Sequence, residues 1–162
     1  FLQNYIPAQA GKMVDIETGN VIGDHSGIMY YTIGQRKGLG IGGPGDAWFV
    51  VGKDYDKNVL YICQGDQKDW LYSTGALITD VNWIASTKPI DKIACNAKFR
   101  YRQPDNPIQL EFIDEDTVYL TFDKPIKAVT PGQAAVFYDG DICLGGGTIE
   151  TVYKDGQPIK YL

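Results

Sequence analysis

Residues 108–122 read Ile-Gln-Leu-Glu-Phe-Ile-Asp-Glu-Asp-Thr-Val-Tyr-Leu-Thr-Phe, and this stretch decides the fold. Apolar side chains occupy every second position in each half, which is the spacing of a strand with one buried face. The acidic turn at residues 114–116 separates the halves, so the stretch predicts an antiparallel hairpin. The side chains expected on the buried face are Ile108, Leu110, Phe112, Val118, Leu120 and Phe122.

Short strands separated by glycine and Asp/Asn turns are expected on both sides of this hairpin. They are Lys12–Ile16, Asn20–Gly23, Trp48–Asp54, Asn58–Gln64, Ala76–Ile84, Ile93–Arg102, Ala134–Tyr138 and Thr148–Tyr153. A single helical turn is expected at Asp66–Tyr72. Residues 1–6 read as the end of a helix stopped by Pro7, so a fragment of a longer protein is expected. The sequence predicts a mainly β protein with two units, residues 1–75 and 76–162, the second an antiparallel barrel or sandwich.

The 162 residues carry 15 basic and 20 acidic side chains, a net charge of −5. This balance argues against a general polyanion-binding protein, which is usually basic overall, but it allows a local basic surface. Three widely spaced cysteines without a secretion signal favour reduced thiols and a cytoplasmic protein. No apolar run approaches the length of a membrane span, so no membrane partner is expected.

The predicted strand Ile93–Arg102 would present a basic face. Alternation places Lys98, Arg100 and Arg102 on its outer side and Tyr101 on its inner side. Arginine binds phosphate through two parallel hydrogen bonds and stacks on bases, so this face is a candidate for RNA contact. The alternative is a solvated strand face without a ligand.

Residues 27–43 hold six glycines, and Arg36 and Lys37 are the only charged side chains among them. Glycine leaves backbone N–H groups accessible, so Gln35-Arg36-Lys37 could clamp phosphate together with the backbone. The stretch is no P-loop, because it lacks the GxxxxGK[ST] pattern. The alternative is a structural loop packed under the sheet.

No catalytic centre and no metal site are expected in this chain. His25 is the only histidine, so a multi-histidine site is excluded and a structural histidine in a turn is expected. Cys63 and Cys95 alternate with apolar residues and are expected to be small buried side chains. Cys143 precedes three glycines and could be exposed, but no cation or histidine lies near it in sequence to activate it.

Seven segments, in order along the chain, carry a family resemblance. They are residues 1–11, Gly23–Gly27, Tyr31–Gly43, Val81–Trp83, Arg100–Gln103, Thr130–Tyr138 and Cys143–Gly147. Together they resemble the tRNA-specific 2-thiouridylase family (MnmA, also called TrmU). The resemblance implies a small central β domain followed by a C-terminal antiparallel β-barrel similar to a barrel of translation elongation factors.

The resemblance also implies a catalytic half outside these residues. Family members carry an ATP-pyrophosphatase domain with an SGGxDS-type loop and two catalytic cysteines, and no SGG occurs here. In the family, ATP with Mg adenylates the wobble uridine of tRNA, and a persulfide then supplies sulfur to make 2-thiouridine. The fragment is therefore expected to bind no cofactor and to be inactive alone, while a sulfur carrier or cysteine desulfurase system serves the parent protein.

By the resemblance, Arg100, Tyr101 and Gln133 contact the anticodon arm, while the loop with Gln35-Arg36-Lys37 faces the active site. The expected tRNA-binding residues, two of them from the basic strand face, are Arg100, Tyr101, Gln133, Gln35, Arg36, Lys37 and Arg102. A competing hypothesis is a protein-interaction β module that docks a sulfur-relay partner or another domain without touching RNA. A free-standing small-molecule enzyme is the weakest reading.

Overall fold

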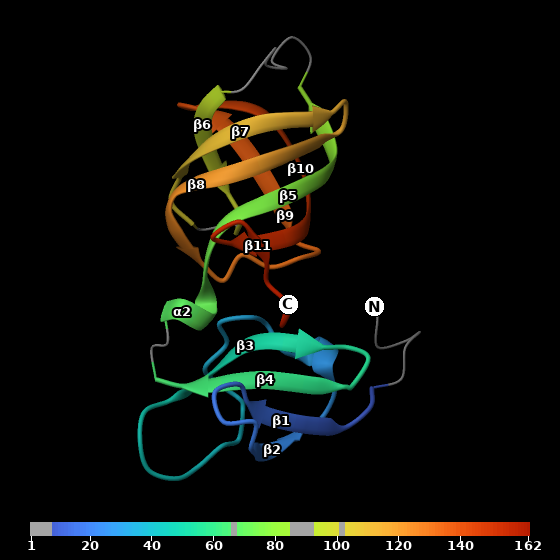
Figure 1. Ribbon diagram of the computed structural model, residues 1–162, viewed down its shortest axis with the longest axis vertical. Helices are drawn as coiled ribbons and strands as arrows, with labels where there is room; N and C mark the ends of the chain where they lie inside the picture. Colours follow the sequence, from blue (N-terminus) through green and yellow to red (C-terminus); the bar gives the residue numbers. More distant parts are fainter. Residues whose placement is uncertain (1–7, 66–67, 85–92, 101–102) are drawn as a thin grey trace. The chain divides into compact units, whose positions relative to one another are not determined.

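A computed structural model describes residues 8–65, 68–84, 93–100 and 103–162. Contacts divide the chain into two compact units, Phe1–Leu71 with Lys160–Leu162, and Tyr72–Ile159 (Figure 1). The division falls shortly before the boundary expected at residue 75, and it groups the last three residues with the first unit. Within the described ranges, no helix is long and apolar enough to span a membrane.

The first unit is a small four-stranded sheet in the order β2-β1-β4-β3. Its elements are β1 (Gly11–Asp15), β2 (Val21–His25), the 3-10 turn η1 (Ile28–Tyr30), β3 (Trp48–Asp54), β4 (Val59–Gln64) and α2 (Lys68–Leu71). β1–β2 and β3–β4 are the two expected hairpins, and β1 joins them by pairing parallel to β4. The predicted helical turn is confirmed by α2.

The end of the chain completes this first unit beside β3. The Lys53 N–H donates to the carbonyl oxygen of Tyr161 at 2.8 Å. The Tyr161 hydroxyl donates to the carbonyl oxygen of Trp70 at 2.7 Å, and the two rings meet edge to face at a centroid distance of 5.4 Å. No local pattern in the sequence announces this contact, because it joins residues far apart in the chain.

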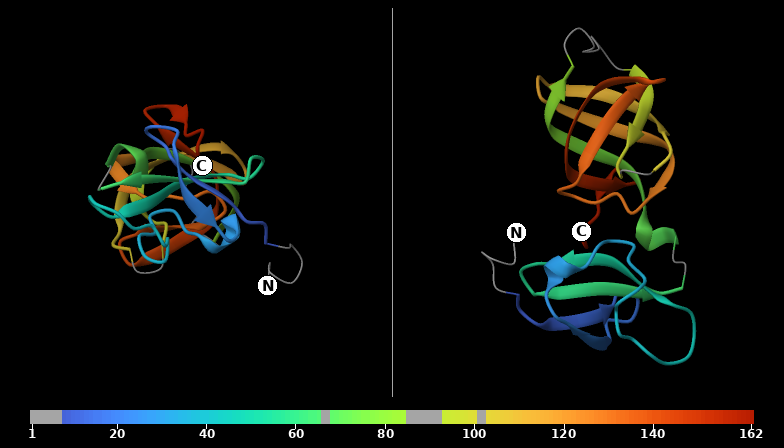
Figure 2. Two further views of the ribbon diagram at one scale, coloured as in Figure 1. Left: turned by 90° about the horizontal axis from the view of Figure 1, so that it is seen from below. Right: turned by 180° about the vertical axis from the view of Figure 1, so that it is seen from behind.

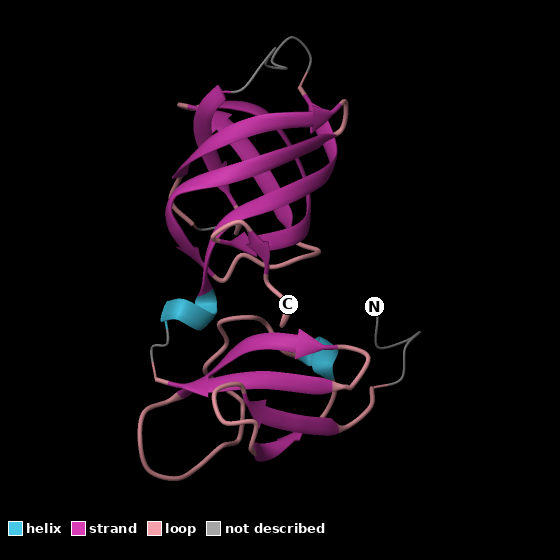
Figure 3. Cartoon of the chain, in the orientation of Figure 1, coloured by secondary structure: helices cyan, strands magenta, loops and turns pink. Residues whose placement is uncertain are grey.

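The second unit is a closed antiparallel barrel. Its strands are β5 (Tyr72–Trp83), β6 (Ile93–Lys98), β7 (Asn106–Asp114), β8 (Thr117–Lys127), β9 (Ala134–Asp139), β10 (Ile142–Lys154) and the short β11 (Gln157–Pro158). They pair in the order β11-β10-β5-β8-β7-β6-β9, and β9 also pairs with β10, which closes six strands into a ring (Figure 2). Strands dominate the described chain (Figure 3), so the mainly β prediction with a C-terminal barrel is confirmed.

The hairpin at residues 108–122 forms as predicted and supplies much of the barrel core. Five of its six inward side chains are buried, and Phe112 is half-buried with its ring 5.6 Å from that of Trp83. Phe137 of β9 is fully buried against the other side of the core, 5.7 Å from Trp83 between ring centroids. Burial of these apolar side chains stabilises the barrel at about 25 cal/mol per Å² removed from water.

Strand β10 is much longer than the expected Thr148–Tyr153, because it runs through three consecutive glycines. These glycines discourage a strand prediction, yet they lie where β10 pairs with β5 on one side and β9 on the other. A Cβ at Gly146 would lie 2.5 Å from the Ala135 carbonyl oxygen, and one at Gly147 would lie 2.6 Å from that of Thr79. Glycine is required here because neighbouring backbones approach too closely for any side chain.

Candidate nucleic-acid interface

The basic strand ends earlier than the sequence predicts. β6 stops at Lys98, so the strand expected to continue through Arg102 was predicted too long. The chain turns instead: the Phe99 N–H donates to the Gln103 side-chain oxygen at 3.0 Å, and the Gln103 N–H donates to the Arg100 carbonyl oxygen at 3.2 Å. The predicted contacts Tyr101 and Arg102 lie outside the described residues.

Arg100 projects from this turn toward the loop that precedes β9. Its side chain is exposed, and its Nη2 donates to the Ala128 carbonyl oxygen at 3.0 Å. The same oxygen accepts a hydrogen bond from the Thr130 hydroxyl at 3.0 Å. The hydrogen bond to Ala128 thus holds the guanidinium in place.

Gln133 lies at the end of the same loop, next to β9. A turn from Thr130 sets its position, since the Gln133 N–H donates to the Thr130 carbonyl oxygen at 3.3 Å. Its own carbonyl oxygen accepts from the Ile149 N–H at 2.8 Å, so its backbone is tied to β10. The side chain is exposed and available for a ligand.

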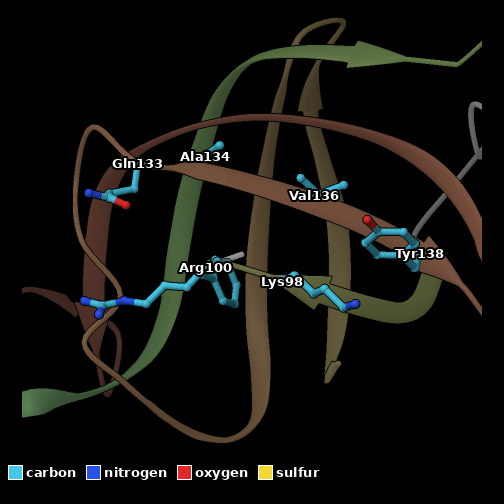
Figure 4. A pocket seen from close by; sticks show the side chains of 7 residues that line it. Lys98, Arg100, Gln133, Ala134, Val136 and Tyr138 are labelled. Atoms are coloured by element: carbon cyan, nitrogen blue, oxygen red, sulfur yellow. The ribbon is translucent and has the colours of Figure 1, made fainter. Parts of the chain in front are cut away.

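These side chains line one pocket of about 320 Å³ on the outer face of the β6–β9 pair (Figure 4). Arg100 and Gln133 stand together at one end, and Lys98 and Tyr138 stand at the other. Ala134 and Val136 form a small apolar floor between the ends. Among the described residues that line this pocket, none is acidic. The pocket therefore combines two cations, an amide and an aromatic ring, a set that suits phosphate and base contact.

The glycine-rich loop forms a second hollow, of about 370 Å³, in the first unit. Arg36 and Lys37 line it and are exposed, next to Asp46 and Trp48. Leu39 is buried, at 7% exposure, and anchors the loop. The loop therefore also has a structural role.

Gln35 has a bracing role inside this loop. Its side-chain oxygen accepts from the Thr32 N–H at 3.0 Å, and its side-chain nitrogen donates to the Lys37 carbonyl oxygen at 2.8 Å. Gln35 is therefore engaged within the loop, whereas Arg36 and Lys37 face the hollow. Their contact with RNA stays a prediction.

His25 is buried at the end of β2 and has a structural role in the first unit. Its Nε2 lies 2.9 Å from the Asn58 carbonyl oxygen, and its ring meets Tyr31 edge to face. In the described part of the chain, no three His, Cys, Asp or Glu side chains converge as a metal site would require.

The cysteines differ in accessibility. Cys63 and Cys95 are buried and Cys143 is half-buried. Burial, with a contribution from Asp139, raises the pKa of the Cys95 thiol to about 11. Cys95 is therefore protonated at neutral pH and cannot act as a nucleophile there.

We expect iodoacetamide at pH 8 to alkylate Cys143 first in the folded protein. Cys63 and Cys95 should react at least tenfold more slowly, because the thiolate of Cys95 is scarce and both side chains are inaccessible. Mass spectrometry of peptides after timed quenching measures the three rates, and denatured protein provides the control in which all three react alike. Fast labelling of Cys95 in the folded state would contradict the buried assignment.

Sequence reasoning missed Tyr138 and Lys98 as partners in this pocket. Lys98 was expected on the basic outer face, but Tyr138 lies on a different strand. The register pairs Asn96 with Tyr138 and Lys98 with Val136, so the two side chains meet diagonally across β6 and β9. Only knowledge of this strand pairing could have joined them.

Comparison with known proteins assigns both units. Residues 1–64 match a family model described as a tRNA methyl transferase PRC-barrel domain, and residues 73–149 match one described as an aminomethyltransferase beta-barrel domain. The whole chain is 53% identical to the tRNA-specific 2-thiouridylase MnmA of Bacillus cytotoxicus, and 53% to that of Geobacillus thermodenitrificans. The corresponding protein of Bacillus cereus is 52% identical over the same 162 residues.

The chain spans 43% of the length of each of these curated relatives. Its two units match the two family models in order, and the similarity to the relatives extends over all 162 residues. The chain therefore belongs to the tRNA-specific 2-thiouridylase (MnmA/TrmU) family and matches its central and C-terminal domains.

Proposed function

We propose that this chain is the tRNA-binding part of a tRNA-specific 2-thiouridylase, with the pocket at Arg100 and Gln133 as its principal contact with the anticodon arm. The parent enzyme would adenylate the wobble uridine with ATP and transfer persulfide sulfur to it. The observation that carries the proposal is the pocket itself, in which two cations and an amide from separate strands and loops converge, with no acid among the described residues that line it.

The charge distribution supports this function. A chain with a net charge of −5 repels a polyanion at long range, so it can hold RNA only through a local basic site. Arg100 is suited to this role, because its side chain is exposed, Ala128 fixes its guanidinium, and a guanidinium pairs well with phosphate. Salt should weaken the binding, since phosphate contacts release counterions.

We propose that ATP binds in a domain of the parent enzyme other than the two in this chain. In P-loop and dinucleotide-binding sites, the phosphates are held by a glycine-rich loop that leads from a strand into a helix. The glycine-rich loop here leads from the short turn η1 into β3, with no helix after it. The loop therefore lacks the P-loop arrangement, in keeping with an ATP site in another domain of the parent protein. A role beside the RNA is proposed for Arg36 and Lys37 instead.

Replacing Arg100 should weaken RNA binding markedly. We expect Arg100→Ala to lower the affinity for an anticodon stem-loop roughly tenfold, because a charge-assisted hydrogen bond contributes about 1.5–3 kcal/mol. The slope of log affinity against log salt should fall by about 1. Fluorescence anisotropy titrations of labelled RNA with the 162-residue chain at several salt concentrations measure both quantities.

Lys124→Ala is the matched control, since it removes the same charge from an exposed position of β8 that does not line the pocket. It should change the affinity less than twofold. If the wild-type chain bound no RNA, or if both variants lost affinity equally, the pocket would not be the RNA site.

The competing function is protein docking. Val21 of β2 and Ile142 of β10 are exposed, but single exposed apolar side chains are common on protein surfaces and do not by themselves indicate a partner. A pull-down that compares tRNA with a sulfur-carrier protein separates the two functions. Retention of the carrier alone would favour docking.

A further inference from the structure

We propose that Tyr138 binds an unpaired base of the RNA by stacking, and that Lys98 moves from the Tyr138 ring to an adjacent phosphate when the base enters. This inference rests on the proposed function and identifies what the far end of the pocket recognises. It names single-stranded RNA, and in particular an unstacked nucleotide, as the ligand of the β6–β9 face.

Tyr138 is placed for such a contact by the alternation of β9. Ala135 and Phe137 are fully buried in the barrel, so Ala134, Val136 and Tyr138 point to the outer face. The small side chains of Ala134 and Val136 lie between Gln133 and Tyr138 along this side of the pocket (Figure 4). A flat group can therefore lie along this floor and end against the ring.

Lys98 closes the far end of the pocket in the free protein. Its Nζ lies 5.2 Å from the centroid of the Tyr138 ring and 3.5 Å from a carboxylate oxygen of Asp105. Both interactions of Lys98 are weak, because the side chains of Lys98 and Asp105 are 37% and 41% exposed to water. Cation–π contacts and ion pairs at exposed positions are weak, because water screens the charge.

A base can displace Lys98 from the ring. Stacking of a base on an aromatic side chain is a stronger contact than an exposed cation–π contact, so it can offset what Lys98 gives up. The displaced ammonium remains beside the ligand and can pair with its phosphate, which replaces the carboxylate of Asp105. Duplex RNA cannot make this exchange, because its base faces are covered by neighbouring bases.

In this proposal, both ends of the pocket contact the same nucleotide and its backbone. Tyr138 and Lys98 hold the base and one phosphate, while Arg100 and Gln133 hold the continuing backbone at the other end (Figure 4). Salt dependence distinguishes the stacking contact of Tyr138 from the phosphate contacts of Lys98 and Arg100. Contacts with phosphate release counterions, whereas stacking releases none.

The test compares Tyr138→Ala with Tyr138→Phe in the 162-residue chain. The ligands are a labelled anticodon stem-loop and a blunt RNA duplex of equal length, titrated by anisotropy. We expect Tyr138→Ala to bind the stem-loop 5- to 100-fold more weakly, with an unchanged salt slope, and to bind the duplex as the wild type does. Tyr138→Phe keeps the ring and should retain the affinity for the stem-loop within twofold.

Lys98→Ala should show the opposite signature, a salt slope lower by about 1. A stem-loop with 2-aminopurine at each loop position in turn should show quenching by the wild type at one position, and none by Tyr138→Ala. Thermal melting followed by circular dichroism checks that each variant is folded.

The outcomes separate this inference from the proposed function. If Arg100→Ala weakens binding while Tyr138→Ala does not, the stacking role is wrong and the tRNA-binding function stands. If Tyr138→Ala weakens stem-loop and duplex equally, or if Tyr138→Phe is as weak as Tyr138→Ala, the aromatic face does not contact a base. If no variant changes binding, both proposals fail.

Discussion

Gly145→Ala is expected to destabilise the barrel by about 2–6 kcal/mol, the combined range for backbone strain and for overpacking. Gly145 has φ +153°, a conformation that residues with a Cβ rarely adopt. An added Cβ would overlap the carbonyl oxygen of Asn82 and lie 3.0 Å from the Cα of Trp83. Both obstacles are backbone atoms of β5, so neither can move without opening the β5–β10 pairing that helps to close the ring.

Gly140→Ala separates strain from crowding. Gly140 has φ +59° in the turn between β9 and β10, and nothing lies within 4 Å of its added Cβ. Its substitution should cost only about 1–2 kcal/mol, the price of the left-handed conformation alone. Urea denaturation gives the stability, and hydrogen exchange of peptides from β5, β9 and β10 identifies the region that opens. Equal losses in the two variants would show that close packing at Gly145 is not what closes the barrel.

Gly52→Ala should destabilise the first unit by about 2–4 kcal/mol, through overpacking and the loss of two hydrogen bonds. A Cβ at Gly52 would overlap the carbonyl oxygen of Tyr161 and lie 2.9 Å from Cδ2 of its ring. The last residues of the chain would have to move away from β3. The bonds from the Lys53 N–H and to the Trp70 carbonyl oxygen would then be lost.

Gly23→Ala is the matched control for this substitution, because Gly23 lies in β2 of the same unit with nothing within 4 Å of an added Cβ. It should change stability by less than about 0.5 kcal/mol. Faster hydrogen exchange at the Lys53 amide in Gly52→Ala, but not in Gly23→Ala, is the expected readout. Unchanged exchange at Lys53 would mean that Tyr161 does not support the sheet.

The strands that sequence reasoning found are those with strong local alternation. The hairpin at residues 108–122 is the best case, since every second side chain is apolar and the turn is acidic. β10 was found only in part, because its glycines look like a loop until the neighbouring strands are in place. β6 was predicted too long, because the alternation of side chains continues in the sequence beyond Lys98. In the structure the strand ends at Lys98, and the Phe99 N–H donates to the Gln103 side chain instead of to a neighbouring strand.

The candidate site was predictable only in pieces. The basic character of Lys98 and Arg100 is visible in the sequence, and the family resemblance points to Gln133. Their convergence with Tyr138 depends on which strands pair and in which register, and a shift of one residue would turn Tyr138 into the core.

The sequence by itself determined that this protein is built of short antiparallel strands, that its barrel hairpin buries one face, and that its cations gather in two segments. These properties follow from neighbouring residues, whose alternation and turn chemistry act over a few positions. Only the tertiary structure decided that three glycines carry a barrel strand, that Tyr161 completes the first sheet, and that Lys98, Arg100, Gln133 and Tyr138 share one pocket. Each of these depends on contacts between distant residues, which exist only after the strands have paired and the barrel has closed.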